Sequence, residues 1–174
     1  MRITSGIYRH RIINMTNLDT TRETQDKVRM AIFNMLGQYF DGGIGLDLFA
    51  GSGAMGLEGL SRGLDLVVFN DINPKAIQVV KDNINSLKIT NYEICNLDYV
   101  EFYKKNKHKY DYIFLDPPYA LNDIDSILDL SMAHLNEGGL IIFEMAKESK
   151  FSDKYTVLKE KSYGIKKVVI FKGA

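Results

Sequence analysis

The sequence predicts a single α/β domain with a mostly parallel sheet and helices on both faces. Apolar runs of strand length alternate with helix-like segments along residues 44–144, which is the pattern of a parallel α/β fold. The chain of 174 residues is long enough for a six- or seven-stranded sheet around one core. Hydrophobic residues make up 45% of it, as expected for a packed interior.

The first elements precede this alternation. Residues 1–14 are expected to form a short β-hairpin or arm, with a polar connector at 15–22. Thr24 can cap a helix that runs to about Tyr39, because apolar residues recur there at helical spacing. Asp41-Gly42-Gly43 ends that helix.

The remaining elements follow in regular order. Gly138-Gly139 is expected to turn into the fifth strand, and Pro74 fits the first turn of a helix. Two runs at Tyr155–Lys161 and Lys166–Phe171, joined at Tyr163-Gly164, predict a closing hairpin. The expected strands are 44–49, 65–70, 91–95, 110–115 and 139–144, and the expected helices are 54–62, 74–87, 98–106 and 122–135.

A glycine-rich turn joins the first of these strands to its helix. Gly51-Ser52-Gly53-Ala54-Met55-Gly56 lacks Cβ atoms at the positions where backbone N–H groups must approach a ligand closely. About twenty residues later the next apolar run ends in Asn70-Asp71, where an acid can bind the two hydroxyls of a ribose. The pattern predicts a nucleoside-containing cofactor, and by itself it also fits a dinucleotide.

Carboxylates at the strand ends favour S-adenosylmethionine over a dinucleotide. Asp47 lies four residues before Gly51, where it suits an ammonium group and would repel a pyrophosphate. Asp98 closes another short strand and could accept from an adenine amino group. In an open parallel sheet these strand ends line one crevice. The expected cofactor-binding residues are Asp47, Phe49, Ala50, Gly51, Ser52, Gly53, Asp71, Ile72, Asp98 and Asp116.

The segment Asp116-Pro117-Pro118-Tyr119 follows the apolar run Tyr112–Leu115. Its two prolines have no N–H, so the loop offers mainly acceptors, beside a carboxylate and an aromatic ring on which a base can stack. Acceptors that hold both protons of an amino group on a heteroaromatic ring would free its lone pair for attack. Asp116, Pro117, Pro118 and Tyr119 are therefore the candidate catalytic residues, although a stiff turn after a strand would have the same composition.

These motifs resemble the bacterial 16S rRNA guanine-N2 methyltransferase family. Asp47–Gly53 is similar to the family's cofactor loop and Asp116–Tyr119 to its catalytic loop. Met1–Arg11 resembles its N-terminal basic hairpin, and Arg22–Leu36 its Arg-Pro-Thr box and first helix. The resemblance implies a class I S-adenosylmethionine-dependent methyltransferase (Rossmann-like) fold with seven strands, the last antiparallel, and an N-terminal hairpin and helix. It also implies transfer of a methyl group to a guanine amino group in 16S rRNA.

The chain departs from the family pattern at four places. Glu23 stands where proline is usual, Lys27 replaces an arginine, His10 replaces a glycine, and Asp71 stands where glutamate is common. These changes are compatible with methyl transfer and bear mainly on how RNA docks.

The net charge of zero is unevenly distributed. Residues 1–29 carry a net charge of +3, residues 30–146 carry −8, and residues 147–174 carry +5. Basic clusters attract phosphate locally, so the expected RNA contacts are Arg2, Arg9, Arg11, Arg22 and Arg29. The C-terminal lysines Lys159, Lys161, Lys166 and Lys167 also fit the solvated face of edge strands.

Other features narrow the class of protein. One cysteine, Cys95, excludes an internal disulfide, and three scattered histidines argue against a metal site. No signal peptide or apolar stretch of membrane-spanning length is evident, so we expect a cytoplasmic protein. We expect one domain over residues 1–174, with residues 1–22 as its basic arm, and a monomer. The expected partner is 16S rRNA or the small ribosomal subunit.

Three alternatives remain. The first is another amino-group methyltransferase, for DNA adenine or protein glutamine, although the chain has no insertion to supply a target-reading domain. The second is a non-catalytic RNA-binding factor of ribosome assembly, against which the intact Asp116, Gly51, Gly53 and Asp71 argue. The third is a dinucleotide-linked oxidoreductase, which leaves the Asp-Pro-Pro-Tyr loop unexplained.

Overall fold

The computed structural model describes residues 1–16 and 22–173, with the side chains of all of these except residues 22–25. Its helices are α1 (Arg22–Leu36), α2 (Ala54–Ser61), α3 (Pro74–Leu87), α4 (Tyr99–Lys105) and α5 (Ile124–Met132). Its strands are β1 (Ile44–Asp47), β2 (Leu66–Asn70), β3 (Tyr92–Cys95), β4 (Tyr110–Leu115), β5 (Leu135–Ala146), β6 (Thr156–Tyr163) and β7 (Lys166–Lys172).

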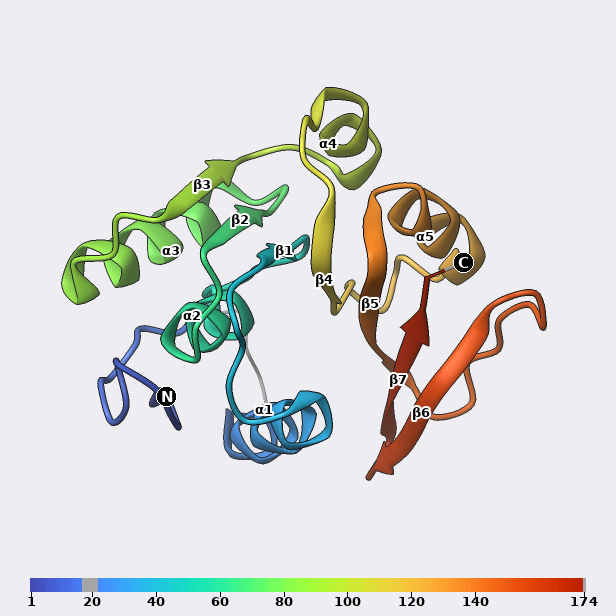
Figure 1. Cartoon of the computed structure of the whole chain (residues 1–174), viewed down its shortest axis with the longest axis horizontal. Helices are drawn as coiled ribbons and strands as arrows, with labels where there is room; N and C mark the ends of the chain where they lie inside the picture. Colours follow the sequence, from blue (N-terminus) through green and yellow to red (C-terminus); the bar gives the residue numbers. More distant parts are fainter. Residues whose placement is uncertain (17–21, 174) are drawn as a thin grey trace.

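The strands form one seven-stranded sheet in the order β3-β2-β1-β4-β5-β7-β6 (Figure 1). Strands β1 to β5 pair in parallel, whereas β7 is antiparallel to both β5 and β6. The order reverses at β1, because β2 lies on one side of it and β4 on the other. Such a reversal leaves a crevice at the carboxyl ends of the two central strands, which is where ligands bind in open α/β sheets.

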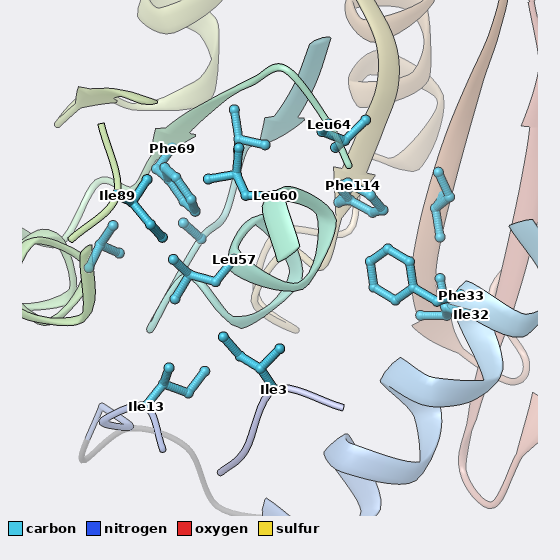
Figure 2. Packing of buried hydrophobic residues seen from close by; sticks show 14 of the residues in the cluster. Ile3, Ile13, Ile32, Phe33, Leu57, Leu60, Leu64, Phe69, Ile89 and Phe114 are labelled. Carbon is cyan, nitrogen blue, oxygen red and sulfur yellow. The ribbon is translucent and has the colours of Figure 1, made fainter. Parts of the chain in front are cut away.

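Helices cover both faces of the sheet because each strand presents apolar side chains alternately to the two sides. Val67 and Phe69 pack with α1, α2, α3 and the N-terminal arm, in the cluster shown in Figure 2. Val68, between them, faces α4 and α5. The predicted α/β architecture with an antiparallel last strand is thereby confirmed.

Several boundaries differ from those expected. Helix α1 begins at Arg22, two residues before the expected cap, and ends at Leu36, where Gly37 has a φ of 102°. Helix α5 ends at Met132, three residues early. Strand β5 begins at Leu135, because Leu135 already pairs with Tyr110 of β4. The register of this pairing then shifts before Leu140 pairs with Tyr112. Gly138 and Gly139, which were expected to form a turn into the strand, lie at this irregularity.

The N-terminal arm, residues 1–16, packs on α2 and α3. Arg2 and Ile12 form one antiparallel bridge, and the side chains of Ile3 and Ile13 enter the core (Figure 2). The expected hairpin is thus a short arm with a single bridge. Buried Asn83 of α3 ties it to the glycine-rich turn: its amide nitrogen donates to Asn14 O and Ser52 O, at 3.0 Å each.

A buried carboxylate on α2 holds the start of the arm. Glu58 is fully buried and accepts from Thr4 N at 3.0 Å and Ser5 N at 3.1 Å. It also pairs with Arg29 Nε at 3.1 Å and with Arg62 Nε at 2.9 Å. Two guanidinium groups and several N–H donors compensate the burial of this carboxylate.

This arrangement corrects the expectation that Arg29 binds RNA. Its side chain is only 3% exposed, pairs with Glu58 and donates to the carbonyl of Arg2. Arg29 is therefore occupied in fixing the arm to α1 and α2. Arg29 was assigned to the basic cluster because it lies close in the chain to other arginines. In an α-helix, however, successive residues point to different sides, so neighbours in the sequence can differ in exposure.

Candidate active site

A cavity of about 630 Å³ opens at the carboxyl ends of the central strands. Among the described residues, four carboxyl groups line it, one from the end of each of four strands: Asp47 (β1), Asp71 (after β2), Asp116 (after β4) and Glu144 (β5). Lys166, at the start of β7, lines it as well. The convergence of acids expected at this edge of the sheet is confirmed for the first three, and Glu144 is an addition that sequence reasoning missed.

The glycine-rich turn forms one wall of the cavity. Gly51 has a φ of 56° and an added Cβ would meet no atom within 4 Å, so its backbone faces open space. Phe49, Ala50, Gly51 and Ser52 line the cavity. Gly53, with a φ of 83°, precedes α2 and does not line it; a Cβ there would lie 3.3 Å from Phe69 and Val80. Gly53 therefore serves the close packing of the turn against β2 and α3.

Asp71 braces this turn. Its Oδ2 accepts from Gly51 N and its Oδ1 from Asn73 N, both at 2.9 Å. Each carboxylate oxygen has a second lone pair, so both can still accept from neighbouring hydroxyls. Ile72, next to it, is 68% exposed and also lines the cavity.

Asp47 is a buried acid, only 4% exposed. Burial raises its pKa to about 8; the N–H of Gly56, 3.0 Å from Oδ2, lowers the pKa, and the charges of Asp71 and Asp116 raise it further. A carboxyl group in such surroundings is stabilised in its charged form by a cationic partner. The cavity is therefore suited to cations and unsuited to a pyrophosphate.

Asp98 lies apart from these acids. It is exposed, caps helix α4 by accepting from Glu101 N at 3.0 Å, and does not line the cavity. Its carboxylate satisfies a helix N-terminus, which is the commonest role of an aspartate at such a position.

The Asp116–Tyr119 loop forms the opposite wall, and all four of its residues line the cavity. It leaves β4 next to the glycine-rich turn that leaves β1, because Asp47 pairs with Phe114. Leu121 N donates to Pro118 O at 2.9 Å and closes the loop. The ring of Tyr119 is 66% exposed and available for stacking.

Glu144 and Lys166 complete this wall. Burial, reinforced by the charge of Asp116, raises the pKa of Glu144 well above its usual value. Lys166 Nζ lies 3.6 Å from Asp116 Oδ1. Burial lowers the pKa of Lys166, but the negative charges of Asp116 and Glu144 raise this pKa by more, so the net shift is upward. One sequence signal could have found Glu144: it is an acid near the end of the fifth parallel strand.

The arginines expected to contact RNA have different surroundings. Arg2, Arg9 and Arg11 are exposed on the arm, where Arg11 also donates to Ser86 O at 2.9 Å. The side chain of Arg22 lies outside the described residues. Lys159 and Lys161 lie on the edge strand β6, as expected, whereas Lys166 points into the cavity.

Comparisons with known proteins identify the family of this chain. The family described as Conserved hypothetical protein 95 matches residues 1–172. Ribosomal RNA small subunit methyltransferase D from Haemophilus influenzae is 33% identical over 173 residues, which span 95% of this chain and 90% of that protein. The chain belongs to the small-subunit rRNA methyltransferase D family.

Two further comparisons extend over nearly the whole chain. YlbH from Bacillus subtilis, provisionally classed as an rRNA methyltransferase, is 38% identical over 181 residues, spanning 99% of this chain and 98% of YlbH. The solved structure of yhhF from Escherichia coli, provisionally classed as a methyltransferase, has a TM-score of 0.88 at 27% identity, with 99% and 97% of the two chains covered. The fold is that of the class I S-adenosylmethionine-dependent methyltransferases. No helix in the described ranges has the length and apolar character needed to cross a membrane.

Proposed function

We propose that this chain transfers a methyl group from S-adenosylmethionine to the exocyclic N2 amino group of a guanine in small-subunit rRNA. One observation carries the proposal. The glycine-rich turn after β1 and the Asp116–Tyr119 loop after β4 leave adjacent strands and open on the same acid-lined cavity. A cofactor held by the first loop would thus lie against an amino group held by the second.

The residues present fit the cofactor. Asp47 suits the ammonium of its amino-acid portion, and Asp71 can accept from both ribose hydroxyls while it braces Gly51. Phe49 and Ile72 supply apolar surface on the cavity wall for an adenine. S-adenosylmethionine, when bound, supplies a methyl group that its sulfonium already activates.

The loop residues act on the acceptor. Asp116 and the carbonyl of Pro117 accept hydrogen bonds from the amino group and orient its lone pair toward the cofactor, while Tyr119 stacks on the base. A base in a loop of RNA must leave its stack to enter this cavity. The amino proton leaves after the nitrogen has become cationic, so these residues need not include a strong base.

The arm is the proposed RNA contact. Arg2, Arg9 and Arg11 are exposed on this arm, residues 1–16. Glu58 and Asn83 hold this arm on α2 and α3, so its arginines have a fixed relation to the site.

The test is a comparison of rRNA with and without the gene. Nucleosides from small-subunit rRNA are analysed by mass spectrometry in a strain lacking the gene and in one complemented with it. We expect N2-methylguanosine to fall by one residue per rRNA in the first strain and to return in the second. An unchanged level of every methylated nucleoside would reject the proposal.

The alternatives make different predictions in the same strains. A non-catalytic assembly factor would leave rRNA methylation intact while subunit assembly slows, and the Asp116→Ala variant would complement it fully. A DNA adenine methyltransferase would change the N6-methyladenine content of DNA. A dinucleotide-linked enzyme would bind NAD tightly, which the carboxylates of the cavity disfavour.

A further inference from the structure

Glu144 is a carboxyl group beside Asp116 to which the proposed function gives no role. Strands β4 and β5 pair with Leu115 opposite Phe143, so Asp116 and Glu144 are the next residues on the two strands. Both side chains line the cavity. Two carboxyl groups side by side in a partly buried site disfavour a second negative charge, so one of them holds a proton, and a ligand that donates two hydrogen bonds could take the place of that proton.

The ammonium of Lys166 lies beside these two carboxyl groups. Lys166 begins β7 opposite Ala146, two residues beyond Glu144, and its Nζ lies 3.6 Å from Asp116 Oδ1. The same Nζ lies 5.7 Å from the ring centroid of Tyr119, over the ring proposed to stack on the base. The wall around the stacking ring therefore presents two carboxyl groups and one ammonium.

Two acceptors and one donor are the groups that one edge of guanine requires. That edge presents the N2 amino group and the N1–H as adjacent donors, followed by the O6 acceptor. Adenine presents its amino group next to N1, which accepts. Two neighbouring carboxylates and one ammonium thus complement guanine, whereas one carboxylate would face the lone pair of N1 in adenine.

We propose that Glu144 determines the specificity for guanine by accepting a hydrogen bond from guanine N1–H, while Lys166 donates to O6. This inference rests on the proposed function and adds to it: Asp116 orients the amino group that reacts, and Glu144 reads the ring nitrogen beside it. The proton held by one of the two carboxyl groups leaves to solvent when the two N–H donors of the base replace it.

The test uses RNA fragments that differ at one base. The target guanine, identified in rRNA methylated by the wild-type protein, is retained in one synthetic fragment and replaced by 2-aminopurine in the other. 2-Aminopurine keeps the amino group at C2, but its N1 is an acceptor and it has no O6. We expect the wild-type protein to prefer guanine by at least about 100-fold in kcat/KM, because the replacement leaves buried polar groups unpaired.

The Glu144→Gln variant should reduce that preference. Its amide can donate to the N1 of 2-aminopurine, so we expect kcat/KM for guanine to fall about 10- to 100-fold and that for 2-aminopurine to change less than about 3-fold. Lys166→Met should likewise lower kcat/KM for guanine more than for 2-aminopurine, because only guanine carries O6. Glu148→Gln, an exposed residue outside the cavity, is the matched control and should keep the wild-type preference.

Two outcomes overturn the inference. A Glu144→Gln variant that loses activity equally on both fragments would make Glu144 a structural residue, and one with the wild-type preference would exclude it from base reading. Affinity for S-adenosylhomocysteine and the Tm, measured on each variant, show whether the cavity is intact. A wild-type protein that methylates no rRNA guanine would refute the proposed function itself, which is a different result from an unchanged preference.

Discussion

Asp116 is the residue on which methyl transfer depends most directly in the proposed mechanism. It lines the cavity but does not brace the glycine-rich turn. We expect Asp116→Ala to keep the affinity for S-adenosylhomocysteine within a few-fold while methyl transfer falls on the order of 100-fold or more. Calorimetry and single-turnover transfer measure the two quantities separately. Comparable activity in the variant would show that the carboxylate does not orient the amino group.

Asp71 should show the opposite pattern, because its carboxylate is proposed to bind the ribose hydroxyls and accepts from Gly51 N at 2.9 Å. We expect Asp71→Ala to weaken binding of S-adenosylhomocysteine by about 1.5–3 kcal/mol, the range of hydrogen bonds to a charged group. Calorimetric titration measures it. An unchanged affinity in a folded variant would remove Asp71 from the cofactor site.

The protonation of Asp47 in the cavity makes the stability of the protein depend on pH. Its pKa rises from 3.8 to about 8 on folding, so the folded state keeps a proton that the unfolded chain releases between these values. The stability that this carboxyl group contributes is present below about pH 4 and is lost as the pH rises through 8. The amide of an Asp47→Asn variant cannot ionise, so the free energy of unfolding of the variant should rise relative to that of the wild type over this range, by about 6 kcal/mol at most.

Chemical denaturation of both proteins at pH 5 and pH 8.5 checks this linkage. The difference in free energy of unfolding should grow with pH in favour of the variant. A difference that stays constant between the two pH values would mean that Asp47 ionises as freely in the folded protein as in the unfolded chain.

At the scale of elements, Glu58 joins the arm to α1 and α2. Its removal would leave the buried guanidinium groups of Arg29 and Arg62 without their partner. Loss of one partner from a buried ion pair costs about 3–5 kcal/mol, so Glu58→Ala should destabilise the protein by that amount. Glu101 on α4, whose side chain is 43% exposed, provides the control variant Glu101→Ala, which should change stability little.

Trypsin digestion shows whether the arm itself is released. In the Glu58→Ala variant, cleavage after Arg9 and Arg11 should become faster at temperatures where the sheet is still folded. Unchanged cleavage there, with unchanged denaturation, would mean that the apolar contacts of Ile3 and Ile13 hold the arm without the ion pairs.

At the scale of the whole molecule, the proposed RNA contact depends on where the charge lies rather than on its sum. Removal of the charges of Arg9 and Arg11, both exposed on the arm, should weaken RNA binding and lower the slope of log affinity against log salt by about 0.7–0.9 per lost phosphate contact. Filter binding over a series of salt concentrations measures the slope, and affinity for S-adenosylhomocysteine should be retained. The control removes the charges of Lys104 and Lys105 on α4, a helix that packs on the other face of the sheet.

An untouched salt slope in the arginine variant would assign the arm a structural role only. A slope that falls equally in the lysine control would mean that RNA binds over the whole surface without a dedicated arm.

Local patterns by themselves determined the α/β fold, the glycine-rich turn and the Asp116–Tyr119 loop. Each rests on neighbours in the chain: strands alternate with helices, glycines permit the turn, and prolines stiffen the loop. The sequence also predicted that Asp47, Asp71 and Asp116 share one crevice, because the carboxyl ends of parallel strands meet at one edge of the sheet.

Only the tertiary structure decided which charges meet. Arg29 is buried because Glu58, 29 residues away, faces it from α2. Glu144 and Lys166 join Asp116 because β7 pairs antiparallel beside β5, which returns a lysine from the basic end of the chain to the acidic cavity. Asp98 looks like the other strand-end acids in the sequence but caps α4 outside the cavity. The spacing of residues in the sequence predicts local geometry only. The electrostatic energy of a charged side chain depends on partners that folding brings close from distant segments of the chain.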